Sequence, residues 1–142
     1  QVPLAPEPAL FCGAGTTNGL TGSELGVTYL LPRAVGTSHA AEILLTGRKV
    51  DAREAAQIGL VSRVVPDGTV VDTALDIAGA MTELSPFGLT MTKQVLWANL
   101  EAGSLGAAIE LENRNQLLAG YTGNLDEARA AFREKRKPQY RD

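Results

Sequence analysis

The sequence predicts a mostly helical α/β protein, and three observations support this fold class. Apolar residues recur at helical spacing over most of residues 69–136, which favours helices with one buried face. The run LVSRVV at residues 60–65 is rich in β-branched residues and predicts one clear strand. Three prolines predict an extended or irregular segment at residues 1–9, and five glycines predict a loop within residues 11–26. Because one strand cannot form a sheet, we expect another segment or subunit to cover part of this chain.

Helices are expected on both sides of the break at Pro32 and Gly36. The glycine-rich segment predicts a loop that opens a short helix near Ser23. Hydroxyl and carboxylate side chains cap helices by accepting bonds from free N–H groups, and glycine commonly ends a helix. Two helical patterns have both signals: residues 38–45, between Thr37 and Gly47, and residues 52–58, between Asp51 and Gly59.

The chain after the strand predicts four further helices. The turn Pro66-Asp67-Gly68 closes the strand, and a helical pattern covers residues 69–84. Three polar residues then stand where a helix N-cap is expected. They are Ser85 before residues 86–101, Ser104 before residues 105–119, and Asn124 before residues 125–136, which Pro138 ends.

Composition excludes several classes of protein. The 142 residues are 44% hydrophobic and 20% charged, which fits a soluble globular domain. No apolar run approaches the roughly 18–20 residues of a membrane helix, and no signal peptide is visible, so we expect a cytoplasmic protein without a membrane partner. One cysteine and one histidine, Cys12 and His39, exclude an internal disulfide and a zinc site. The net charge of −3 gives no reason to expect a nucleic-acid partner.

Basic residues concentrate at the C-terminal end. Of the 13 basic residues, six lie in the last 14 positions, which carry a net charge of +4 against −7 for the remainder. Such a segment is either a solvated helix end, where cations favour the helix dipole, or a surface that meets an anionic ligand.

Glu24 is the carboxylate that the sequence singles out. Its neighbours in GLTGSELGVTYLLPR are small or apolar, with no cation before Arg33. Apolar surroundings disfavour a charged carboxylate and allow it to exchange a proton near neutral pH. The alternative is a glutamate in the first turn of a helix, stabilised by the helix dipole. A Ser-His-Asp triad is not indicated, because His39 lies in a helical pattern without suitable partners.

Longer motifs carry a resemblance to a known family. Residues 30–65 contain LPR-x-x-G, then A-x-E-x-x-L-T-G, then A-x-E-A-x-x-x-G-L-V, and the chain closes with AFREKRKPQYRD. In these motifs, and in Lys93 on the helix after Ser85, the chain resembles the enoyl-CoA hydratase/isomerase, or crotonase, family over about residues 11–142.

The resemblance implies a crotonase-like fold, a spiral of ββα turns, of which this chain is the mostly helical C-terminal portion. It implies that residues 1–68 end the spiral core domain and that residues 69–142 form a helical oligomerisation region. The family's oxyanion hole is made by two backbone N–H groups. They belong to the N-terminal half of a typical family member, which has no counterpart in this chain. We therefore expect a truncated product or a portion of a longer protein.

The resemblance also implies site residues. The second hydratase glutamate of the family falls at Gly15 or Thr16, where this chain has no carboxylate. Some isomerases of the family place an aspartate eight residues before the proline of LPR and two before a glycine. Glu24 has both spacings, to Pro32 and to Gly26, and is the candidate catalytic residue.

For the C-terminal helix, the resemblance implies contact with the coenzyme A of a neighbouring subunit. Phe132 and Lys135 occupy the motif positions for the adenine and phosphate contacts. The alternative is that Phe132 packs in an interface between helices. The implied substrate is an acyl-CoA thioester, with no metal and no redox cofactor, and the implied assembly is a homo-trimer or hexamer.

Two classes of function remain open from the sequence. The first is an enzyme that hydrates an enoyl-CoA or isomerises its double bond. The family's hydratases use two glutamates, the first of which belongs to the half without a counterpart here, and the absence of both from this chain favours isomerisation. The second is a truncated, non-catalytic member of the family that serves as an assembly or partner-binding module.

Overall fold

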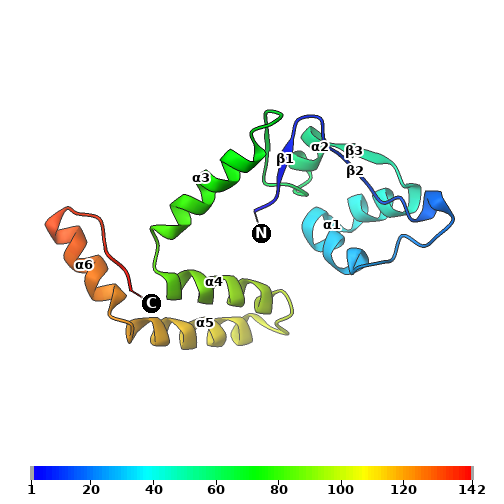
Figure 1. The fold of residues 1–142 in the computed structure, drawn as a ribbon. Helices are drawn as coiled ribbons and strands as arrows, with labels where there is room; N and C mark the ends of the chain where they lie inside the picture. Colours follow the sequence, from blue (N-terminus) through cyan, green and yellow to red (C-terminus); the bar gives the residue numbers. More distant parts are fainter. Residues whose placement is uncertain (1, 142) are drawn as a thin grey trace. The chain divides into compact units, whose positions relative to one another are not determined.

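The computed structural model describes residues 2–141, and the chain divides after Leu75 into two compact units. The predicted division after residue 68, with a core role for one part and an assembly role for the other, stays a prediction. The first unit contains β1 (Leu4–Pro6), β2 (Leu10–Cys12), the 3-10 helix η1 (Thr16–Asn18), α1 (Val27–Thr46), β3 (Lys49–Asp51), α2 (Ala52–Gln57) and β4 (Arg63–Val65) (Figure 1). Helix α3 (Val70–Thr82) crosses the division, and α4 (Pro86–Asn99), α5 (Leu105–Gly120) and α6 (Asn124–Glu134) follow in the second unit.

Four short strands form two ladders in the first unit. Strand β1 pairs in parallel with β4, and β2 pairs antiparallel with β3. The expectation of a single strand is therefore wrong, because residues 4–6, 10–12 and 49–51 also form strands, and of the two alternatives for the N-terminal segment the extended one is confirmed for residues 4–6. Proline signals are local, whereas these strands are held by partners far along the chain, which a short sequence window does not detect. Pro6 is tolerated because the N–H that donates to β4 at this end of the ladder belongs to Glu7, which bonds the carbonyl of Val65 at 3.0 Å, so the missing N–H of Pro6 is not needed.

The core of the first unit is made of small side chains. Its buried members are Ala5, Ile43, Val50, Ala52, Ala55 and Val61. Val50, in the middle of β3, is the largest fully buried side chain among the described residues. Alanines on α2 and β1 let the helix and strands approach closely, but they remove little apolar surface from water. This unit consequently has a thin core.

Helix α1 begins earlier than predicted and contains a break. The short helix expected near Ser23 does not form; α1 starts at Val27 after Gly26, whose φ is 80°. Pro32 lies inside the helix, and the interruption occurs only at Gly36, with φ 78° and ψ 161°. The part after Gly36 corresponds to the predicted helix, and Gly47 ends it in a left-handed conformation, as predicted.

Three of the predicted N-caps are confirmed. Asp51 accepts a bond from the N–H of Glu54 at 2.8 Å. Ser85 and Ser104 accept bonds from the N–H groups three residues later, at 3.2 and 3.1 Å. These caps satisfy donors that a helix cannot pair internally, and they fix the starts of α2, α4 and α5.

The predicted cap at Asn124 is wrong, because the side chain is used elsewhere. Gly123 is the N-cap of α6, and the buried Asn124 is its first residue. The Asn124 amide donates to Ser85 Oγ at 3.1 Å and to the carbonyl of Arg141 at 2.9 Å, and it accepts the N–H of Arg141 at 3.0 Å. It thus joins the starts of α4 and α6 to the C-terminal segment. The helix also ends at Glu134, before the predicted Arg136.

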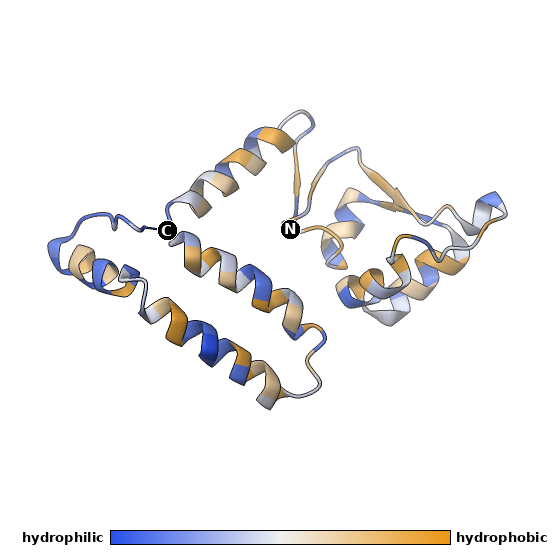
Figure 2. Ribbon diagram, turned by 60° about the horizontal axis from the view of Figure 1, so that its bottom comes forward, coloured by the Kyte–Doolittle hydropathy of each residue, from blue (hydrophilic) through white to orange (hydrophobic). Residues whose placement is uncertain are grey.

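Apolar side chains of the second unit are poorly covered. Helices α4 and α5 pack against each other (Figure 1), yet none of their described residues is buried. Apolar residues lie along both helices in Figure 2. Exposed examples are Leu96, Leu100, Leu105, Ile109, Leu117 and Leu118. Exposed apolar surface of this kind marks interaction sites in soluble proteins.

Among residues 2–141, no helix combines the length and the hydropathy that crossing a membrane requires.

We predict that Asn124→Ala destabilises the protein by about 2 kcal/mol, because it removes a buried amide with three hydrogen bonds. Chemical denaturation measures the change. Asn113→Ala, at an exposed asparagine of α5, is the matched control and should change the free energy of unfolding by less than about 0.5 kcal/mol. Equal effects of the two substitutions would contradict a structural role for Asn124.

Candidate functional site

Glu24 lies in the exposed segment that joins η1 to α1. Its carbonyl oxygen accepts the N–H of Val27 at 2.9 Å. The next residue, Leu25, has a left-handed backbone with φ 50° and is 98% exposed. The first unit therefore does not bury Glu24 in the apolar surroundings that the sequence suggested. It also does not place Glu24 inside the first turn of a helix, as the alternative interpretation required.

The glycine-rich segment before Glu24 packs tightly against the end of α1. Thr16 Oγ1 donates to the carbonyl oxygen of Leu44 at 3.2 Å. A Cβ atom added at Gly15 would lie 2.1 Å from the carbonyl oxygen of Thr21. Because no real Cβ contact is that short, Gly15 admits no side chain unless the backbone moves. At the two positions to which the resemblance assigns the family's second glutamate, Gly15 is thus closed by backbone and Thr16 is engaged in a hydrogen bond.

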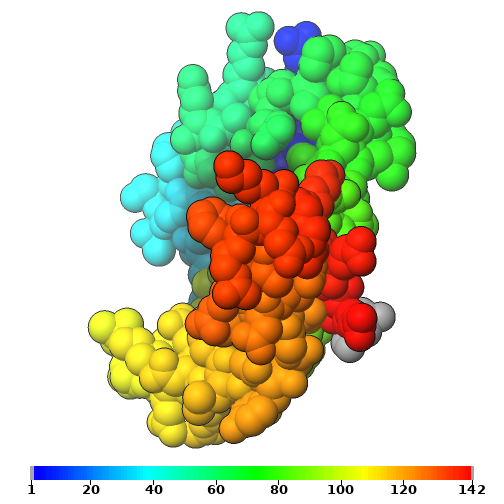
Figure 3. Space-filling view, turned by 90° about the vertical axis from the view of Figure 1, so that its left-hand side faces the viewer, coloured from blue at the N-terminus to red at the C-terminus, as the bar shows by residue number. Residues whose placement is uncertain are grey.

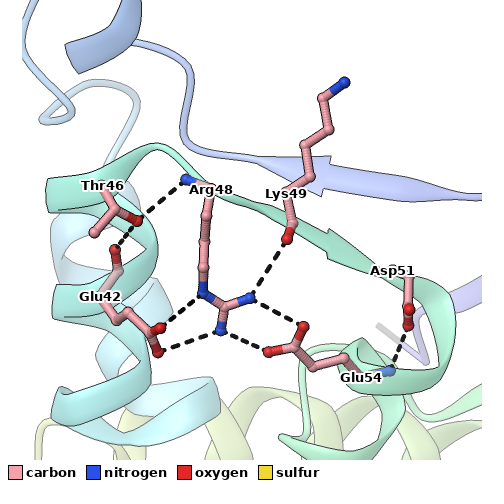
Figure 4. Close-up of polar contacts among 6 residues, drawn as sticks. All are labelled: Glu42, Thr46, Arg48, Lys49, Asp51 and Glu54. Atoms are coloured by element: carbon pink, nitrogen blue, oxygen red, sulfur yellow. Dashed lines mark hydrogen bonds and ion pairs between the residues drawn. The ribbon is translucent and has the colours of Figure 1, made fainter.

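Arg48 joins α1 to α2 through two carboxylates (Figure 4). Its guanidinium binds both oxygens of Glu54, at 2.6 and 3.0 Å, and its Nε lies 3.0 Å from Glu42 Oε1. The hydrogen bonds from Arg48 lower the pKa of Glu54, and the two carboxylates raise the pKa of Arg48. We interpret this cluster as structural, since all its charges are mutually paired. This cluster was not predicted from the sequence, because Glu42 and Glu54 lie on different helices and only folding brings both to Arg48.

Phe132 and Lys135 lie near the end of α6. The Phe132 ring is 86% exposed and borders a shallow hollow with Ala128, Arg129 and Arg133. Lys135 is the residue directly after α6, is exposed, and has a left-handed backbone. The structure therefore brings the aromatic and basic candidates to one end of one helix. Glu24 belongs to the first unit and these two residues to the second.

Several of the C-terminal cations serve within the second unit. Arg136 pairs with Glu127 and Glu134, and Lys137 pairs with Glu83 at 2.8 Å. Arg129 lies 3.5 Å from Asp126. Among residues 2–141, Arg133 and Lys135 make no ion pair within 4 Å. The basic segment thus contains cations that form ion pairs within the second unit and cations that face solvent.

Glu127, in the first turn of α6, binds the residues that follow the helix. Its carboxylate accepts bonds from both terminal nitrogens of Arg136, at 2.5 and 3.1 Å, and from the N–H of Gln139 at 2.7 Å. These bonds, those from Arg136 first, lower the pKa of Glu127 to about 2. Residues 135–141, which we call the C-terminal strap, lie back along α6 as a result (Figure 3). This role of Glu127 has no local signal in the sequence, because Arg136 and Gln139 lie 9 and 12 residues away.

A groove of about 620 Å³ lies between α4 and α5, lined partly by Met91, Val95 and Leu96. None of the three candidate site residues lines it. Within residues 2–141, no cluster of three or more His, Cys, Asp or Glu side chains is arranged to hold a metal ion.

Comparison with known proteins identifies relatives along the whole chain. The enoyl-CoA hydratase/isomerase family matches residues 3–142. A Mycobacterium tuberculosis protein named "Probable enoyl-CoA hydratase EchA12" is 49% identical over 143 residues, which are 100% of this chain and 50% of the relative. The chain thus spans about half the length of the curated relatives it matches.

Two solved structures are similar in sequence and fold. A crystal structure described as a probable enoyl-CoA hydratase/isomerase from Mycobacterium abscessus has a TM-score of 0.92 and 45% identity, and the match covers 97% of this chain and 54% of the other. A monofunctional enoyl-CoA isomerase from Mycobacterium smegmatis has a TM-score of 0.68 and 52% identity, covering 75% and 49%. The crotonase-like fold expected for the chain is confirmed by these structures.

We predict that the tie between Glu127 and the C-terminal strap weakens in acid. The folded protein lowers the pKa of Glu127 from 4.5 to about 2. The ionised carboxylate is therefore stabilised in the folded state, by its hydrogen bonds from Arg136 and Gln139, relative to the unfolded state. Its contribution to stability is complete above the unfolded value and is lost as the pH falls from about 4.5 towards 2. Denaturation of wild type and Glu127→Gln across this pH range should give free energies that converge in acid. A difference independent of pH would contradict the prediction.

Proposed function

Because the chain belongs to the enoyl-CoA hydratase/isomerase family, we propose that the complete protein transfers a proton on the acyl chain of an enoyl-CoA thioester. The family match over residues 3–142 carries this proposal. The substrate is a coenzyme A thioester, and the reaction needs neither a metal nor a redox cofactor. Backbone N–H donors outside this chain would stabilise the negative charge that develops on the thioester oxygen. We place the reaction in the cytoplasm.

Two reactions fit this proposal, and isomerisation of the double bond is the better supported. Gly15 has no space for a side chain, and the hydroxyl of Thr16 is bonded to Leu44. A carboxylate that activates water for hydration would have to come from another position. The 52% identity to an enoyl-CoA isomerase agrees with this preference. Hydration remains the second candidate, because relatives at 49% identity are named enoyl-CoA hydratases.

Glu24 is the residue that we propose as the proton carrier. It follows a tightly packed loop and precedes a turn with two left-handed residues, so its backbone position is well defined. Its exposure means that bound substrate, or parts of the complete protein outside this chain, must cover the carboxylate to favour proton transfer.

Phe132 and Lys135 are proposed to bind the nucleotide part of coenzyme A. An exposed aromatic ring offers a stacking surface to adenine, and an unpaired ammonium offers charge-assisted hydrogen bonds to phosphate. Arg133, which borders the same hollow, adds positive charge.

We also propose that the protein is a homo-trimer or a hexamer, since the exposed apolar residues of α4 and α5 need cover. The alternative of a non-catalytic module is not favoured, because the family match covers residues 3–142, including the site of Glu24.

We predict that Glu24→Gln lowers kcat about 10²–10⁴-fold in the complete protein and changes thioester binding little. The substitution keeps size and hydrogen bonding but removes the titrating proton. Both hydration and double-bond migration should be assayed. Glu7→Gln, at another exposed glutamate of the first unit, is the control. Near-wild-type rates for both reactions in Glu24→Gln would remove this residue from the mechanism.

We predict that Lys135→Ala weakens coenzyme A binding about tenfold, the scale of one lost charge-assisted contact. The loss should shrink at high salt, where exposed charges are screened. Arg114→Ala, at an exposed cation of α5, should leave affinity unchanged. Calorimetry that finds wild-type affinity in the Phe132→Ala/Lys135→Ala double variant would rule out this surface as the coenzyme A contact.

A further inference from the structure

The end of α6 is closed by a strained turn. The N–H of Lys135 donates to the carbonyl of Phe132 at 3.3 Å, and the N–H of Arg136 donates to the carbonyl of Ala131 at 3.0 Å. This is the pattern of a Schellman motif, whose left-handed residue is usually glycine. Here that residue is Lys135, with φ 55° and ψ 37°. A lysine at this position costs backbone strain that glycine would avoid.

The residues on either side of Lys135 are held by a network of charges. Arg136 binds both carboxylate oxygens of Glu127, and it also binds Glu134 and the carbonyl of Lys137. Glu127 additionally accepts the N–H of Gln139. These contacts fix the backbone just after Lys135, and the hydrogen bonds of the turn fix it just before Lys135. The rotation of the Lys135 backbone is restricted from both sides, while its side chain stays exposed.

The two cations directly after Lys135 are paired with carboxylates. Arg136 is neutralised by Glu127 and Glu134, and Lys137 by Glu83. Lys135 directly precedes Arg136 and lies two residues before Lys137, yet it makes no ion pair among residues 2–141. A strained backbone that presents an unpaired cation has no stabilising purpose in this unit, and such strain is typical of binding sites.

We infer that Glu127 is a positioning residue that acts through Arg136 to fix the direction of Lys135 for a phosphate group of the bound thioester. This inference rests on the proposed coenzyme A contact of Lys135. Fixing Lys135 before binding reduces the entropy lost when the contact forms. The contacts of Glu127 with Arg136 and Gln139, which we call the Glu127 clamp, therefore raise affinity without touching the ligand.

A double-mutant cycle on the complete protein tests the positioning role, with coenzyme A as the probe in calorimetry. Glu127→Ala should weaken binding about three- to fivefold, and Lys135→Ala about tenfold. The double variant should bind no more weakly than Lys135→Ala, because Glu127 acts only through that lysine. Glu110→Ala, at an exposed, ion-paired glutamate of α5, should bind like wild type. Independent, multiplicative losses in the double variant would overturn the inference.

Hydrogen exchange of the Gln139 amide separates this inference from the proposed function. If Lys135→Ala has wild-type affinity, the proposed contact fails and the inference falls with it. If Lys135→Ala binds weakly but Glu127→Ala binds normally while the Gln139 amide exchanges faster, the contact stands and the positioning role is overturned.

A glycine at position 135 tests the strain. Lys135→Gly and Lys135→Ala both remove the charge and should bind coenzyme A equally weakly. Only glycine relieves the left-handed strain, so Lys135→Gly should unfold at a higher temperature than Lys135→Ala. A lower unfolding temperature for Lys135→Gly would show that the turn carries no strain and would overturn this part of the argument.

Discussion

Insufficient cover for the apolar faces of α4 and α5 is the constraint on which the rest of the structure depends. None of their described side chains is buried, and the core of the first unit consists largely of alanine and valine. Burial of apolar surface is the main favourable term in folding, so neither unit gains much from it alone. The chain spans about half of the length of its curated relatives, and the exposed faces of α4 and α5 agree with the proposed assembly, in which a second copy would cover them.

Hydrogen bonds and ion pairs consequently fix much of the local arrangement of the helices. In the first unit, Arg48 connects a carboxylate of α1 to one of α2. In the second, Asn124 joins the starts of two helices to the end of the chain, and Glu127 holds the strap. These interactions are directional, so they fix orientation even where hydrophobic packing is thin. Their placement matters for function, since one of them lies next to the proposed coenzyme A contact.

The features that could be predicted from the sequence are those with local causes. Asp51, Ser85 and Ser104 cap helices because a side chain needs to reach only three residues along the chain. Asn124 has the same local preference, but its amide meets Arg141, which folding brings close. The pairing of β1 with β4 and the cluster around Arg48 also join residues of different elements, which only the tertiary fold brings together. Motif resemblance, rather than periodicity, pointed to Phe132 and Lys135, and no local signal distinguished the paired from the unpaired cations.

Backbone strain and the candidate site residues coincide. Among residues 2–141, two residues other than glycine have positive φ, Leu25 and Lys135. One directly follows Glu24, and the other is itself the proposed phosphate contact. A left-handed residue with a side chain costs on the order of 1 kcal/mol, and two such costs are notable in a chain with so thin a core. Strain of this kind persists only where surrounding contacts fix it. Lys135 has such contacts in its own turn and in the Glu127 clamp. Leu25 is almost fully exposed, so under the proposal that Glu24 becomes covered in the complete protein, the contacts that fix the Leu25 conformation would come from the same covering surface.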